Sequence, residues 1–101
     1  MTRSLLALLA ALSLAPAHAH TPLFDCFDNQ DGTITCEGGF SDGGSAEGVL
    51  VRVVDAQGKV LEQAPMGADN SVVLQRPEGE FSVLFAAGEG HELWVFGEDI
   101  Y

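Results

Sequence analysis

Histidine is the residue type in this 101-residue chain that most directly suggests metal chemistry. The stretch AHAHTPLF (17–24) contains His20, and the stretch GEGHE (88–92) contains His91. If processing makes His20 the first residue, its α-amine and imidazole form a chelate, and His91 would supply a third nitrogen. Such ligands suit Cu(II), Ni(II) or Zn(II) rather than Ca²⁺ or Mg²⁺. The competing interpretation is a frayed terminus and an exposed turn histidine. We predict a site for nickel, cobalt or copper at His20 and His91.

The role of His20 depends on where a predicted signal peptide ends. A basic residue, an apolar run over 5–14 and the small-residue segment APAHA (15–19) are together typical of a secretory signal. Cleavage after Ala19 is favoured and leaves His20 first. Cleavage after Ala17 leaves a histidine first and His20 third, a pattern that chelates Cu(II) or Ni(II) with backbone amides.

The processed chain is therefore expected to be one small exported domain. We predict a signal peptide over 1–19 and a single domain over 20–101, in the periplasm or outside the cell. No later apolar run is long enough for a membrane anchor, so stable membrane insertion is not expected.

The two cysteines, Cys26 and Cys36, both fall in the exported part. An even number of cysteines in a small exported domain predicts one disulfide. Their C-x9-C spacing matches neither a zinc site nor a thioredoxin motif, so metal ligation by the thiols is not expected. The bridge closes a short loop and is expected to stabilise the fold by roughly 3 kcal/mol.

The charge of the exported part is strongly negative. Three cationic side chains, Arg52, Lys59 and Arg76, stand against fifteen acidic ones, which gives a formal charge of −12 with the histidines neutral. Such a surface repels nucleic acid and anionic lipid, and it favours cations or a basic partner. The acids also serve the simpler purpose of solubility.

Short strand-like segments dominate the chain from residue 23 onward. They recur at spacings of about ten residues and are separated by turn clusters rich in Gly, Asp, Asn and Pro. The glycine-rich stretch 38–48 is expected to be a loop anchored by Phe40, and Asp42 within it is interpreted as a turn former. The pattern predicts an all-β protein, an antiparallel sandwich of about seven strands, transthyretin-like or immunoglobulin-like. Single strands are expected at 23–27, 33–37, 71–75, 80–86 and 92–96. Two further strands are expected to form a hairpin over 48–64 that turns at 55–58.

Several motifs resemble known families. The order V-x-V-x-D-x-x-G-K-V-L (51–61), P-E-G-E-F-S-V (77–83) and A-G-E-G-H (87–91) resembles transthyretin-like or carboxypeptidase-regulatory-like sandwich domains. The segments C-E-G-G-F-S-D-G (36–43) and G-H-E-L-W-V (90–95), in an exported chain, resemble small periplasmic accessory proteins associated with nickel and cobalt uptake. These resemblances imply a sandwich fold and a link to metal uptake.

The last predicted strand raises the question of a protein partner. Trp94 and Phe96 alternate with Leu93 and Val95, so one pair faces outward. Packing of the aromatic pair in the core is the simpler explanation. An exposed aromatic pair beside an edge strand would instead suit a protein partner.

The sequence leaves two functions open. The first is a periplasmic binding module that holds nickel, cobalt or copper through an N-terminal histidine and works with an envelope transporter or receptor. The second is a metal-free domain that docks on an envelope receptor or an exported enzyme. Catalysis is not expected, because no serine lies in a G-x-S-x-G elbow and bonded cysteines are not nucleophiles.

Overall fold

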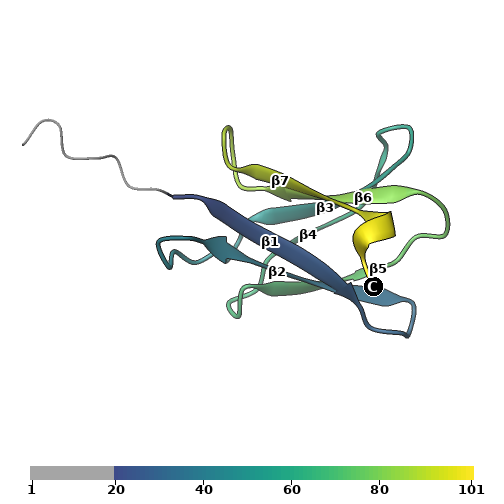
Figure 1. The fold of residues 1–101 in the computed structure, drawn as a ribbon, viewed down its shortest axis with the longest axis horizontal. Coiled ribbons are helices and arrows are strands. Elements are labelled where there is room, and N and C mark those ends of the chain that lie inside the picture. Colours follow the sequence, from purple (N-terminus) through teal and green to yellow (C-terminus); the bar gives the residue numbers. More distant parts are fainter. Residues whose placement is uncertain (1–19) are drawn as a thin grey trace, which may run out of the picture.

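The computed structural model describes residues 20–101, and the predicted signal peptide lies outside the described residues. Two antiparallel sheets pack face to face (Figure 1). The predicted seven-stranded β-sandwich is confirmed. One sheet has the strand order β1-β2-β5 and the other has the order β4-β3-β6-β7. The strands are β1 Pro22–Asp28, β2 Thr33–Phe40, β3 Leu50–Asp55, β4 Val60–Pro65, β5 Ser71–Gln75, β6 Phe81–Ala86 and β7 Glu92–Phe96. A short 3₁₀ helix, η1 Gly97–Asp99, follows β7.

The strand order is close to that of an immunoglobulin sandwich. In constant-type immunoglobulin domains the first, second, fourth and fifth strands share one sheet and the third, sixth and seventh share the other. Here the fourth strand pairs with the third instead. The sandwich is bordered on one side by β1 and β7 and on the other by β4 and β5, which lie next to each other across the two sheets.

The core follows from the alternation of side chains along the strands. Every second residue of β3 and β6 points between the sheets, so Val51, Val53, Val83 and Phe85 are fully buried. The turn between β3 and β4 is closed by Asp55, whose carboxylate accepts hydrogen bonds from the backbone N–H groups of residues 57 and 59 at 2.9 Å. Asparagine and aspartate side chains favour such turns because they can accept from the backbone two residues further on.

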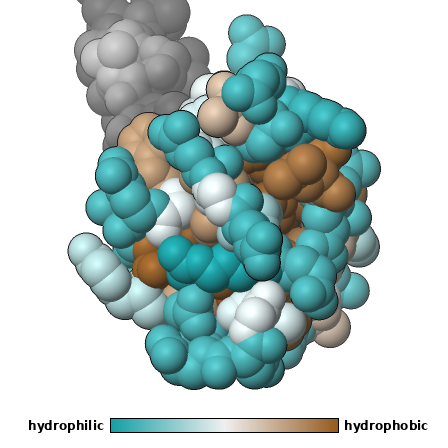
Figure 2. Space-filling model, turned by 90° about the vertical axis from the view of Figure 1, so that its right-hand side faces the viewer, coloured by the Kyte–Doolittle hydropathy of each residue, from teal (hydrophilic) through white to brown (hydrophobic). Residues whose placement is uncertain are grey.

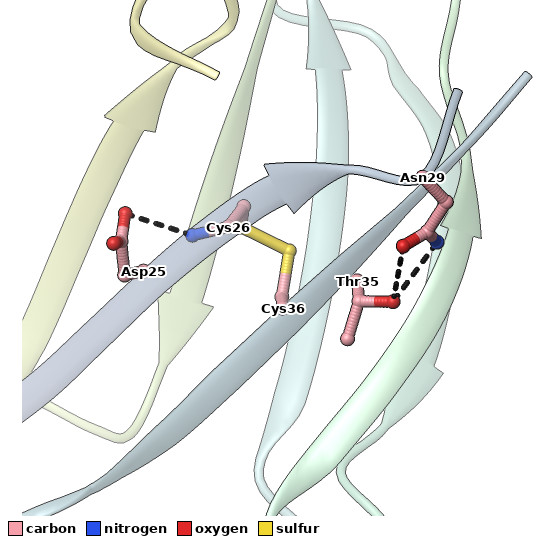
Figure 3. The surroundings of a disulfide bond; sticks show 5 residues. All are labelled: Asp25, Cys26, Asn29, Thr35 and Cys36. Atoms are coloured by element: carbon pink, nitrogen blue, oxygen red, sulfur yellow. Dashed lines mark hydrogen bonds between the residues drawn. A yellow bond between two sulfur atoms is a disulfide. The ribbon is translucent and has the colours of Figure 1, made fainter. Parts of the chain in front are cut away.

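The predicted disulfide is confirmed and joins β1 to β2 (Figure 3). Cys26 and Cys36 lie directly opposite each other in the hairpin register, with 4.0 Å between their Cα atoms. Both cysteines are buried on the inner face of the sheet. The bond therefore fixes the register of the first hairpin from inside the core.

The glycine-rich stretch is only partly a loop, so this expectation was wrong for residues 38–40. These residues extend β2, because they pair with Phe24, Leu23 and Pro22 of β1. Gly38 is packed so tightly that a Cβ atom there would lie 2.8 Å from the Phe85 ring and 2.9 Å from the methyl group of Met66. The missing side chain permits close packing here.

The expectation that Trp94 and Phe96 belong to the core was also wrong. Their side chains are 49% and 55% exposed, whereas Leu93 and Val95 pack against the core. Strand alternation allows only one of the two pairs to face inward. The smaller aliphatic pair fills the space between the sheets, and the aromatic pair lies on the outer face.

Candidate metal site

His20 is positioned by a continuation of the first hairpin. Pro22 pairs with Phe40, and the next residues along keep the same register. The backbone N–H of Ser41 donates to the carbonyl oxygen of Thr21 at 2.8 Å, and the N–H of Thr21 donates to the Ser41 hydroxyl at 3.1 Å. The register therefore carries His20 to a position opposite Asp42.

The His20 ring has three close neighbours. Its Nδ1 lies 2.6 Å from Oδ2 of Asp42. The ring stacks on Phe40, with 4.1 Å between ring centroids and 10° between the planes. A Cβ atom at Gly44 would lie 3.1 Å from Cε1 of His20, so the absence of a side chain there leaves room for the imidazole. These contacts give the ring one defined orientation.

His91 approaches from the corner between β6 and β7. Its backbone N–H donates to the Gly88 carbonyl at 2.9 Å, which closes a tight turn. Its ring lies edge-on to His20, with 5.6 Å between the centroids. The structure thus brings together the two residues predicted as metal ligands, although 70 residues separate them in the sequence.

The hydrogen bonds of the two rings determine which nitrogens are free. Nδ1 of His91 lies 3.2 Å from the backbone carbonyl oxygen of Glu89, and a carbonyl oxygen only accepts. Nδ1 of His20 donates in the same way to the Asp42 carboxylate. Each neutral ring therefore carries its proton on Nδ1 and keeps the lone pair of Nε2, the form that a metal ion requires.

Asp42 gives the site a negative group that sequence reasoning interpreted only as a turn former. The hydrogen bond from His20 is the main reason why the pKa of Asp42 lies below the ordinary 3.8, and the backbone N–H of Gly44 lowers the pKa further. A carboxylate that holds Nδ1 of a histidine fixes its orientation and raises its basicity toward a metal at Nε2.

The donor set in the described part of the chain is small. No three His, Cys, Asp or Glu side chains are grouped so that they could hold a metal ion within residues 20–101. Both cysteines are in the disulfide. An imidazole centroid lies roughly 3 Å from an ion bound at about 2.1 Å. The 5.6 Å between the ring centroids of His20 and His91 is thus within the span of one ion.

Three contributors to this cluster, Asp42, Phe40 and Gly44, were not predicted. One signal was available: continuing the register of the predicted hairpin, by three residues before 23 and five after 37, places His20 opposite Asp42. Local sequence did not favour this extension, because the glycines at 38 and 39 suggested a loop.

Comparisons with known proteins do not assign this chain to a family. No family model, curated protein or solved structure matches it. Residues 20–101 include no helix that is long and apolar enough to cross a membrane.

Proposed function

We propose that this protein is an exported β-sandwich that binds a divalent transition metal ion, nickel, cobalt or copper, through His20 and His91, and that it serves metal uptake. The observation that carries the proposal is the meeting of the two histidines, each with Nδ1 bonded to an oxygen atom. Two preorganised imidazole nitrogens suit these ions and not Ca²⁺ or Mg²⁺.

Two modes of binding through His20 can be distinguished chemically. An α-amine on His20 can close a six-membered chelate only with Nδ1 of the same residue. In the structure Nδ1 of His20 is hydrogen-bonded to the Asp42 carboxylate. We therefore assign the binding atom as Nε2, with Asp42 holding the ring. Formation of the chelate would require Nδ1 to give up its hydrogen bond to Asp42.

The proposed location rests on the disulfide and the N-terminal sequence. Disulfides persist in oxidising compartments such as the bacterial periplasm. The bond between Cys26 and Cys36 is buried in the core and is part of the fold. An envelope transporter or receptor is the natural recipient of a metal held at such a site.

Calorimetric titration of protein that begins at His20 with Ni(II), Co(II) and Cu(II) tests the proposal. We expect one ion per chain for at least one of these metals. The double variant His20→Ala, His91→Ala should bind it at least about tenfold more weakly, since loss of supporting groups alone costs that much. Equal affinity for the variant and the unmodified chain would overturn the metal site.

A pair of charge-matched variants decides the mode of binding. Asp42→Asn removes the carboxylate behind His20, whereas Asp31→Asn removes an equal charge that contacts Thr33 in the turn between β1 and β2. Binding through Nε2 predicts about 10- to 100-fold weaker affinity for Asp42→Asn only. Unchanged or tighter binding by Asp42→Asn would indicate the chelate through Nδ1.

A further inference from the structure

The outer face of the four-stranded sheet carries an exposed apolar surface. Across the register, Trp94 lies beside Leu84, and Phe96 lies beside Ser82, which neighbours Val54. Leu84 and Val54 are only 7% and 9% exposed although they face outward, so their neighbours on this face cover them. We call this surface the aromatic face; it comprises Val54, Val60, Leu84, Trp94 and Phe96.

The aromatic face runs into a hollow of about 430 Å³ at the end of the molecule where η1 lies. Phe96 and Phe81 line the hollow, together with Glu80 and Glu98. Figure 2 views this end of the molecule and shows hydrophobic surface framed by hydrophilic side chains. The lining of the hollow therefore combines aromatic rings with carboxylate groups.

One cationic side chain, Arg76, also lines the hollow, but its guanidinium is already hydrogen-bonded within the fold. Its guanidinium donates to Asp28 at 2.7 Å and to the carbonyl oxygens of Ile100 and Gly97 at 3.0 and 3.3 Å. Glu80 and Glu98 form no ion pair within the described residues. Their negative charge is thus left for a partner.

We propose that the aromatic face and its hollow dock a basic amphipathic segment of a partner protein, in which lysine or arginine alternates with apolar side chains. The apolar side chains would cover Trp94 and Phe96, and a cation would lie between Glu80 and Glu98. Charge complementarity selects this partner, because residues 20–101 carry three cationic and fifteen acidic side chains. A second copy would bring the same negative charge to the interface and is disfavoured.

This proposal is independent of the metal site. His91 precedes β7 and η1 follows it, so the two sites lie at opposite ends of that strand (Figure 1). We therefore expect substitutions at one site to leave the other intact. Failure of metal binding and failure of docking are therefore separate results.

The single tryptophan of the chain, Trp94, reports on the aromatic face directly. The probe is a tryptophan-free synthetic peptide in which lysine alternates with valine and phenylalanine. We expect saturable binding with a blue shift of Trp94 emission, and no shift with a peptide that has glutamate in place of lysine. No shift with the lysine peptide, or equal shifts with both, would overturn the proposal.

Substitutions locate the binding surface. Phe96→Ser and the pair Glu80→Gln, Glu98→Gln should each weaken binding about tenfold or more, since central aromatic and charged contacts dominate interfaces. Val73→Ser is the apolar control, because Val73 is 58% exposed on the other sheet. Glu37→Gln with Glu47→Gln is the charge control. Losses that are equal for test and control variants would show attraction by net charge alone and refute the docking face.

Light scattering of the free protein tests the competing occupant. We expect a monomer mass at all concentrations, in agreement with a face reserved for a basic partner. A dimer that Phe96→Ser dissociates would assign the aromatic face to a second copy and overturn the proposal.

Discussion

At the scale of single residues, the most informative contact is between His20 and Asp42. His20 is 45% exposed and Asp42 38% exposed, yet stacking on Phe40 and the continued hairpin register hold the imidazole in place. Backbone pairing beyond the end of β1 therefore keeps His20 in place at this edge of the sheet. The aspartate determines that the Nδ1 atom of His20 carries the proton and that Nε2 keeps its lone pair, and this is the property on which the proposed metal site depends.

The pKa of Asp42 tests this contact without any metal. Because His20 donates to the carboxylate, the folded protein holds the pKa of Asp42 below 3.8. Its contribution to stability is present above that pH and is lost as the pH falls through the folded pKa. We expect His20→Ala to raise the pKa of Asp42 toward 3.8, measured by NMR titration of the carboxyl carbon.

Asp31 is the internal control in the same titration. Its pKa is also lowered, but by the hydroxyl and backbone N–H of Thr33. The pKa of Asp31 should not move in His20→Ala. If Asp42 titrates identically in both proteins, the contact with His20 does not form in solution.

At the scale of elements, alternation and turn chemistry made the strands predictable. The turn at 55–58 has an aspartate that accepts from the backbone, and the inward residues of β6 are apolar, so local sequence and fold agree. The end of β2 was not predictable, because glycine favours loops locally and only contact with Phe85 and Met66 explains Gly38. The face that Trp94 takes depends on the space between the sheets, which local pattern does not specify.

The structural role of Arg76 was not predicted either. This residue connects three parts of the fold. It follows β5, donates to Asp28 at the end of β1, and donates to carbonyl oxygens of the C-terminal segment. Its guanidinium also lies over the Phe81 ring, 5.4 Å from the centroid. Only a planar group with several donors can serve these partners together.

We therefore expect Arg76→Lys to lower the free energy of unfolding by about 2 kcal/mol, because an ammonium group cannot replace the fork of donors. Urea denaturation measures the change. The matched control is Arg52→Lys, since within residues 20–101 the side chain of Arg52 donates a hydrogen bond only to Gln63, at the exposed edge. Equal losses for the two variants would mean that the C-terminal segment does not depend on Arg76.

At the scale of the whole molecule, the burial of a small core has to outweigh the repulsion among many negative charges on the surface. Residues 20–101 form one sandwich whose core is built from small aliphatic side chains, a few phenylalanines and the disulfide. Residues 20–101 carry fifteen acids against three cations, and only Asp28 and Asp42 form ion pairs among the described residues. Most of the carboxylates therefore repel one another without local compensation.

Salt should consequently stabilise this protein. Raising the ionic strength from about 0.02 M to about 0.5 M shortens the Debye length several-fold and screens repulsion among exposed charges. We expect the urea midpoint to rise with sodium chloride. Glu78 allows a graded test, since it is exposed in the turn before β6. Glu78→Gln should reduce the salt dependence slightly and Glu78→Lys should reduce it more, because they remove one and two units of net negative charge. A midpoint that falls with salt, or a reversed order of the two variants, would show that specific ion pairs outweigh the repulsion.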